Sequence, residues 1–142
     1  MTKEAAKPPD LANRGVLIVG GGISGVTTAL ELAGLGISVT LVEKGETLGG
    51  LAASFCCKAS EVCNKCFACV VDKRIRDINN TDISILTRTE LAGIEGGSGA
   101  YRVTLDNAGR TLEREVAALV VAAGIDPYDA HLKGEYGYGY LK

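Results

Sequence analysis

The sequence predicts a single α/β domain in which a parallel β-sheet is combined with an antiparallel β-meander. A short apolar run at residues 16–19 is bounded by glycine, as strands buried on both faces of a parallel sheet are. A helical pattern and a second apolar strand follow it directly, which gives a β-α-β unit. Later in the chain, three alternating segments are separated by glycine-rich turns, and this pattern is typical of antiparallel strands.

Composition is consistent with one soluble domain. The chain has 142 residues, of which 46% are apolar, so it can bury a sizeable core without disulfides. Fifteen Lys and Arg residues stand against 17 Asp and Glu, which gives no basic surface for nucleic acid. No apolar run approaches a membrane span or a signal peptide. We expect a cytoplasmic protein with a flexible polar tail over residues 1–14 and a folded domain over residues 15–142.

The β-α-β unit is predicted from residue 16 to residue 43. The first strand covers residues 16–19, and a helix over residues 23–35 places Val26, Leu30 and Ala33 on one face. Gly36 follows where a left-handed helix end is expected. The second strand covers residues 37–42 and ends directly before Glu43.

The second half of the chain is predicted to add one helix, a third parallel strand, the meander and a last buried strand. The helix covers residues 70–78, with Val71, Ile75 and Ile78 on one side, and a turn follows it at residues 79–81. The remaining elements are a strand at 83–86, meander strands at 91–95, 101–105 and 111–115, turns at 96–99 and 106–109, and an apolar strand at 117–122 that returns to the sheet.

A glycine-rich loop stands between the first strand and the helix. Residues 20–25, GGGISG, supply the pattern G-x-G-x-x-G in the strand-to-helix context that this motif requires. Gly20 permits the tight turn, Gly22 lets a pyrophosphate approach the backbone, and Gly25 lets the helix pack close to the strand. The helix N-terminus attracts the same phosphates. We therefore predict a Rossmann-like dinucleotide-binding domain with cofactor contacts from Gly20, Gly22, Ile23, Ser24 and Gly25.

Glu43 extends this site toward a ribose. It lies at the end of the second strand, about 20 residues after the loop, where a carboxylate can accept both ribose hydroxyls of an adenosine. The same charge would repel a 2′-phosphate, which excludes an NADP pattern. The spacing from Glu43-Lys44 to Gly49-Gly50 resembles the two-dinucleotide-binding-domain flavoproteins, as does the strand that ends at Gly124. This resemblance favours FAD over NAD and adds Lys44, Gly49, Gly50 and Gly124 to the cofactor-binding residues.

All five cysteines lie between residues 56 and 69. The compact run Cys63-x2-Cys66-x2-Cys69 is typical of ligation to a 4Fe-4S cluster, with a remote cysteine as the fourth ligand. We favour Cys57 as that ligand, and Cys56 remains the alternative. Structural zinc, which usually takes two separated C-x2-C hooks, and redox-active thiols are the other interpretations of segment 55–70.

The motifs together resemble the A subunit of heterodisulfide reductase and its relatives. Beyond the glycine loop, Glu43 and the cysteines, residues 124–129 and 133–139 are similar to that family's segment after its Ala-Thr-Gly turn; here Ala123 replaces the threonine. The resemblance runs from Val16 onward. It implies an electron-transferring iron-sulfur flavoprotein, an oxidoreductase component with FAD and one 4Fe-4S cluster that works with partner subunits in disulfide or sulfur metabolism.

Family members continue well beyond this length, so the resemblance implies a truncated, N-terminal FAD-binding part. It is either a fragment, the product of a split or shortened gene, or a subunit that needs another chain to complete the flavin site. A non-catalytic assembly subunit with a Cys-bound metal docking loop and an NAD-binding fragment are the alternatives. No residue is assigned a catalytic role. His131 is expected at the surface, without an evident carboxylate and nucleophile partnership. Three tyrosines at positions 136, 138 and 140 fit either a flavin edge or a partner interface.

Overall fold

Four parallel strands form the centre of the fold. The computed structural model describes residues 14–55, 57, 61–62 and 68–139. The strands are β1 (Val16–Val19), β2 (Val39–Val42), β3 (Ser84–Leu86) and β7 (Ala118–Val121), in the order β3-β2-β1-β7. The backbone of β1 pairs with β2 on one side and with β7 on the other. This arrangement confirms the predicted parallel sheet and the return of the last apolar segment to it.

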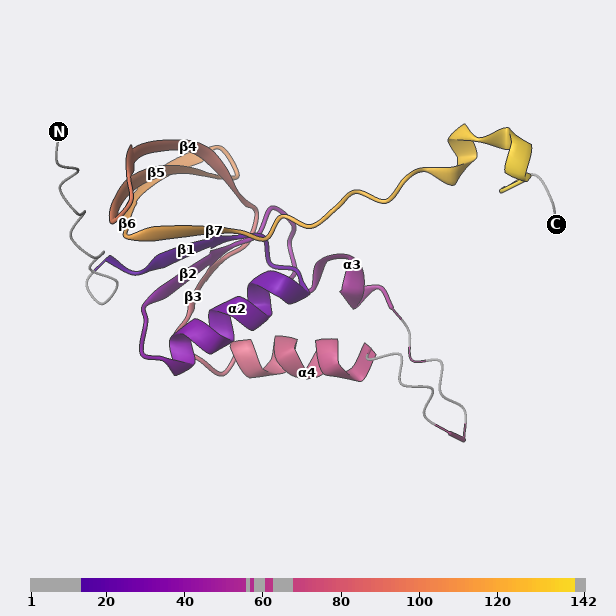
Figure 1. Ribbon diagram of the computed structural model, residues 1–142, viewed down its shortest axis with the longest axis horizontal. Helices are drawn as coiled ribbons and strands as arrows, with labels where there is room; N and C mark the ends of the chain where they lie inside the picture. Colours follow the sequence, from indigo (N-terminus) through magenta and orange to yellow (C-terminus); the bar gives the residue numbers. More distant parts are fainter. Residues whose placement is uncertain (1–13, 56, 58–60, 63–67, 140–142) are drawn as a thin grey trace, which may run out of the picture.

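Two helices cover one face of this sheet (Figure 1). They are α2 (Ile23–Gly34) and α4 (Ala68–Ile78); a short third helix, α3 (Gly50–Ala53), precedes the cysteine segment. Ile18 and Leu41 of the sheet pack with Val26 of α2 and Ile78 of α4 in a fully buried cluster. The apolar face predicted for the second helix is thus confirmed at Ile78, and the helix begins two residues earlier than expected.

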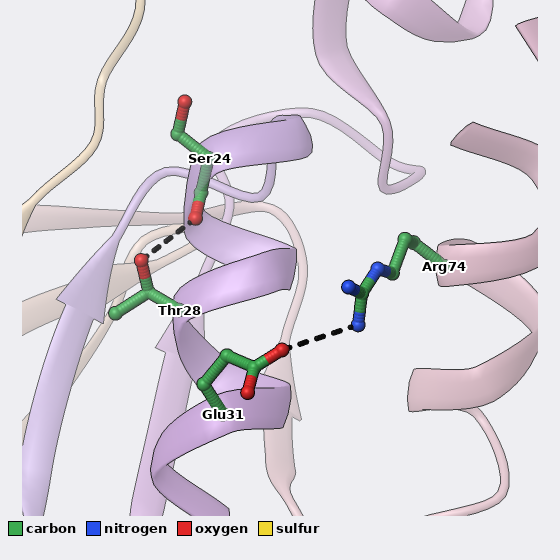
Figure 2. A network of polar contacts seen from close by, with 4 residues as sticks. All are labelled: Ser24, Thr28, Glu31 and Arg74. Carbon is green, nitrogen blue, oxygen red and sulfur yellow. Dashed lines mark hydrogen bonds and ion pairs between the residues drawn. The ribbon is translucent and has the colours of Figure 1, made fainter. Parts of the chain in front are cut away.

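The two covering helices also meet through polar side chains at their exposed rim. Figure 2 shows the guanidinium of Arg74, on α4, directed at the carboxylate of Glu31 on α2, with 3.5 Å between Nη1 and Oε1. The Thr28 hydroxyl donates to the Ser24 carbonyl oxygen one turn earlier in α2, at 2.8 Å. An exposed pair of this kind contributes little to stability, so the apolar cluster beneath it holds the helices on the sheet.

The end of α2 explains a difference from the predicted second strand. Gly36 has φ +77°, and its N–H donates to the Ala33 carbonyl while the N–H of Ile37 donates to the Leu32 carbonyl. These two bonds form a Schellman motif, which uses the residues that follow the helix to satisfy its last carbonyls. Because Ile37 belongs to this cap, β2 begins at Val39 and not at residue 37 as predicted.

The antiparallel meander covers the other face of the sheet (Figure 1). Its strands are β4 (Thr89–Gly97), β5 (Ala100–Asn107) and β6 (Arg110–Val116), in that order. Val103 and Leu105 of the meander are fully buried against Leu17 of β1. The meander prediction is confirmed, but the turn predicted at residues 96–99 is shorter, because Gly96 and Gly97 pair with β5. The second hairpin turn likewise contains only residues 108 and 109.

The chain leaves the sheet through β7, which is an edge strand of the parallel sheet. Its side chains are less buried than predicted, and Val121, at the end of the strand, is 69% exposed. Residues 122–139 then extend away from the body (Figure 1) and include two short 3₁₀ turns, η1 (Ala130–Leu132) and η2 (Gly134–Tyr136). Of the predicted N-terminal tail, only Arg14 lies among the described residues. None of the described helices is long and apolar enough to cross a membrane.

Candidate dinucleotide-binding site

The glycine loop joins β1 to α2 at the carboxyl end of β1. Gly20 has φ +111°, and a Cβ at this position would collide with the carbonyl oxygen of Ala122. A Cβ on Gly25 would collide with the carbonyl oxygen of Gly20. At Gly22, by contrast, a Cβ would meet no heavy atom within 4 Å. The first and third motif glycines therefore let the chain pack on itself, while the second one faces open space that a ligand can enter.

The N-terminus of α2 opens onto the same space. Gly22 is the N-cap residue, with φ −70° and ψ −179°, and it offers no side-chain cap to the helix. The first N–H groups of a helix lack intrahelical partners, and the helix dipole places a partial positive charge there. An uncapped N-terminus beside a side-chain-free residue is a suitable cradle for a phosphate group.

Glu43 closes the loop from the end of β2. One carboxylate oxygen, Oε2, accepts the N–H of Gly21 at 2.7 Å, and the other, Oε1, accepts the N–H of Gly45 at 2.7 Å. A carboxylate has about four acceptor positions, so these two bonds fix its orientation and leave capacity for ligand hydroxyls. Gly21 itself leaves no room for a side chain, because a Cβ would lie 2.6 Å from the Leu48 side chain and 2.9 Å from Glu43 Cβ.

Gly49 and Gly50 pack directly on the glycine loop. The N–H of Gly49 donates to the carbonyl of Gly21 at 2.8 Å, and Gly49 forms an isolated parallel bridge with Gly22. Both residues have positive φ, +109° and +53°. A Cβ on Gly49 would lie 2.8 Å from the Ile75 side chain of α4. This second glycine pair therefore holds the start of α3 against the loop, in the space between α2 and α4.

One cavity of about 640 Å³ collects these features at the carboxyl ends of the parallel strands. Ligands of open α/β sheets bind at this edge, where connections from one strand diverge to opposite sides. Of the predicted cofactor-binding residues, the cavity is lined by Gly20, Gly22, Ile23, Ser24, Glu43, Lys44, Gly49, Gly50 and Gly124. Gly25 does not line it and acts in helix packing instead.

The rest of the cavity wall comes mostly from residues that were not predicted to bind the cofactor. Residues 89–91, at the start of β4, form one part, and residues 122–127, after β7, form another. Leu51 and Phe55, from α3 and the residues after it, add apolar surface that is more than half exposed. Only Gly124 of these segments was predicted, because the sheet order that brings the strand ends together is not encoded in any local pattern. The open Gly22 cradle, the uncapped helix and the oriented carboxylate fit a dinucleotide.

Comparison with known proteins agrees with this geometry. Residues 8–142 match the family described as pyridine nucleotide-disulphide oxidoreductase. The chain belongs to this family. Within it, the chain is 33% identical over 96% of its length to the A subunit of a ferredoxin/F(420)H(2)-dependent CoB-CoM heterodisulfide reductase of Methanosarcina acetivorans. It is 30% identical over 89% of its length to an iron-sulfur A subunit of the CoB–CoM heterodisulfide reductase of Methanopyrus kandleri. The predicted resemblance to these proteins is thus confirmed.

The match covers only part of these relatives. The chain spans 17% of the length of the Methanosarcina protein and 19% of the Methanopyrus protein. Among solved structures, L-proline dehydrogenase from P. horikoshii superposes with a TM-score of 0.61 at 24% identity, over 77% of this chain and 22% of that one. This structural similarity supports the fold alone, and the fold class predicted from sequence is confirmed.

The cysteine segment of this chain lies largely outside the described residues. Cys56, Cys63 and Cys66 all fall there, so the predicted ligand set stays a prediction. Cys57 is exposed, and Cys69 is exposed at the start of α4. Among the described residues, no three His, Cys, Asp or Glu side chains gather closely enough to hold a metal ion.

His131 of the domain is exposed, as predicted, but it has a carboxylate neighbour that the sequence did not reveal. Its Nδ1 lies 3.0 Å from Oδ1 of Asp129, and its ring stacks edge-on against Tyr138 with 4.8 Å between centroids. The same Asp129 oxygen accepts the N–H of His131 and caps η1. The pair therefore has a local structural explanation, and Tyr138 contacts His131 at an exposed position on the extended segment.

Proposed function

We propose that this chain binds FAD through the adenosine and pyrophosphate half of the cofactor. The observation that carries the proposal is the convergence on one cavity of the open Gly22 position, the uncapped N-terminus of α2 and the oriented Glu43 carboxylate. Gly22 lets the pyrophosphate approach, the N–H groups of Ile23 and Ser24 donate to it, and Glu43 accepts from the ribose hydroxyls. Lys44, Gly49, Gly50 and Gly124 complete the contacts.

The proposed reaction class is electron transfer in disulfide or sulfur redox metabolism. Bound flavin would supply the exchange between electron pairs and single electrons, while this chain binds and orients the cofactor. Support comes from the family match and from relatives named as subunits of heterodisulfide reductases. We infer that the chain acts in the cytoplasm with other subunits of such a complex.

We further propose that Cys57, Cys63, Cys66 and Cys69 bind one 4Fe-4S cluster. The C-x2-C-x2-C run supports this assignment, and the Methanopyrus relative is named as an iron-sulfur subunit. Cys57 and Cys69 are both exposed, so neither thiol is enclosed in the apolar core. Cys56 is the competing fourth ligand, and single substitutions Cys56→Ser and Cys57→Ser distinguish the two by which one lowers the iron content.

Anaerobic purification followed by measurement of flavin, iron, acid-labile sulfide and zinc per chain tests the proposed FAD site and the proposed cluster. We expect bound FAD and about four irons with four sulfides, and Cys63→Ser should lose the iron and the visible absorption while it keeps FAD. Titration of the full chain should show higher affinity for FAD than for NADH. A zinc-bound chain without flavin affinity would contradict the proposal and favour the alternative of a non-catalytic assembly subunit.

A further inference from the structure

The corner between β3 and β4 has an unusual backbone at Arg88. This residue has φ +51°, a left-handed conformation that only one other non-glycine residue among the described ones, Ala108, also adopts. The two are joined, because the N–H of Ala108 donates to the carbonyl of Arg88 at 3.1 Å. Left-handed backbone is unfavourable for residues with a Cβ and persists where surrounding contacts enforce it. The contacts at this corner therefore hold an unfavourable backbone in place.

Three interactions run from this corner to the loop that carries Glu43. The N–H of Arg88 donates to the carbonyl of Gly45 at 2.9 Å, and the N–H of Thr89 donates to the carbonyl of Glu43 at 2.9 Å. The Arg88 guanidinium lies 2.9 Å from Oε1 of Glu46. Gly45, held in this way, is the residue whose N–H donates to the Glu43 carboxylate at 2.7 Å. The corner is thus connected through Gly45 to the Glu43 carboxylate, which faces the proposed ribose position.

The other side of the corner is anchored in the meander. Thr89 is only 1% exposed, and its hydroxyl accepts the side-chain amide of Asn107 at 2.6 Å and donates to the carbonyl of Thr87 at 2.8 Å. The Asn107 amide also donates to the Thr87 carbonyl, at 3.1 Å. Contacts therefore continue without a gap from the β5–β6 hairpin, through the corner, to the Glu43 loop.

We propose that Arg88 is a positioning residue for the Glu43 carboxylate, and the inference rests on the proposed binding of an adenosine diphosphate group at this site. The guanidinium holds Glu46, and the Arg88 backbone holds Gly45, so that both oxygens of Glu43 keep the orientation set by Gly21 and Gly45. The side chains of Arg88 and Glu46 are 62% and 74% exposed. Exposed pairs contribute little free energy, so the expected effect of this pair on ligand binding is small as well.

The test measures the affinity of the full chain for ADP and for 2′,3′-dideoxy-ADP by calorimetry. In Arg88→Ala we expect about a two- to fivefold loss of ADP affinity, the range that an exposed pair can supply, and no change for dideoxy-ADP, which cannot bond to Glu43. Arg88→Gly, whose backbone adopts positive φ readily, should show the same loss without any loss of folding. Reversal of the pair in Arg88→Glu/Glu46→Arg should restore the ADP affinity.

The matched control is Arg102→Ala, because Arg102 forms a similarly exposed pair with Glu115, at 3.5 Å and 59% exposure each, in the meander away from the cavity. It should leave both affinities unchanged. Equal losses for the two ligands in Arg88→Ala, or no loss for either, would overturn the positioning role. Wild-type chain that binds ADP no better than dideoxy-ADP, or binds neither, would instead overturn the proposed site itself, so the two failures are distinguishable.

Discussion

Individual glycines of the loop serve different purposes: some leave room for a ligand, and others allow close packing in the folded chain. Gly22 belongs to the first kind. A Cβ at this position meets nothing within 4 Å, and its φ of −70° is open to any residue. Gly22→Val should therefore lower the free energy of unfolding by only about 1 kcal/mol, through poorer helix capping. Its branched side chain would occupy the phosphate position, so FAD affinity should fall at least about tenfold, or about 1.4 kcal/mol.

Calorimetric titration with FAD and thermal unfolding of the same sample test this prediction. Gly34→Val is a suitable control, because Gly34 lies at the opposite end of α2 and also faces open space. It should leave the FAD affinity unchanged. If Gly22→Val kept its affinity, the phosphate would not lie against this loop.

Gly25 represents the folding role. Its Cβ would collide with the carbonyl oxygen of Gly20, which is backbone and cannot rotate away. Gly25→Ala should push α2 off β1 and cost about 1–3 kcal/mol of unfolding free energy, as overpacked cores do, measured by urea denaturation. Gly22→Ala adds the same methyl group where it meets nothing, so its cost should be smaller. Equal costs for the two variants would show that helix and strand are not in close contact.

At the scale of elements, two substitutions near the end of α2 should change the free energy of unfolding in opposite directions. Gly36 has φ +77° and no neighbour within 4 Å of its Cβ position, so Gly36→Ala should cost about 1–2 kcal/mol through backbone strain alone. Gly34 is helical, and Gly34→Ala should instead stabilise by about 0.5–1 kcal/mol. Thermal unfolding of both variants measures the difference, and a destabilised Gly34→Ala would contradict the helix boundary.

Elements could be predicted from sequence where one local signal dominated. The apolar run of β1 forms a strand as predicted. On the predicted face of α2, Val26 is buried and Leu30 and Ala33 are partly buried, while the buried Ala29 was not predicted. Predictions were wrong where one local backbone interaction competed with another. Ile37 has strand propensity but completes the helix cap, and Gly96 and Gly97 favour a turn yet pair with β5. The four residues of α3 carry too short a pattern to be recognised.

At the scale of the whole molecule, part of the candidate site could be predicted from local sequence and part could not. The glycine motif and Glu43 are close in sequence and could be predicted, because phosphate and ribose contacts need fixed residue types at fixed spacing. The wall formed by residues 89–91 could not be predicted, since it reaches the cavity only through the order β3-β2-β1-β7 and the packing of the meander. The role of Arg88, which lies next to this wall, was missed for the same reason. The cluster ligands Cys63 and Cys66 lie outside the described residues and stay predictions.

The shared sheet makes a last prediction about cooperativity. Leu17 and Ile18 are adjacent in β1 and fully buried on opposite faces, one against the meander and the other against the helices. Because a single layer of strands supports both cores, loss of packing on one side should weaken the other. Leu105→Ala, in the meander core, should cost about 2–5 kcal/mol and lower hydrogen-exchange protection of α2 amides as much as that of β5 amides. Leu35→Ala, at a site 76% exposed, is the control and should change neither the free energy of unfolding nor the exchange protection. If Leu105→Ala lowered protection in β5 but not in α2, the meander would be an independent folding unit.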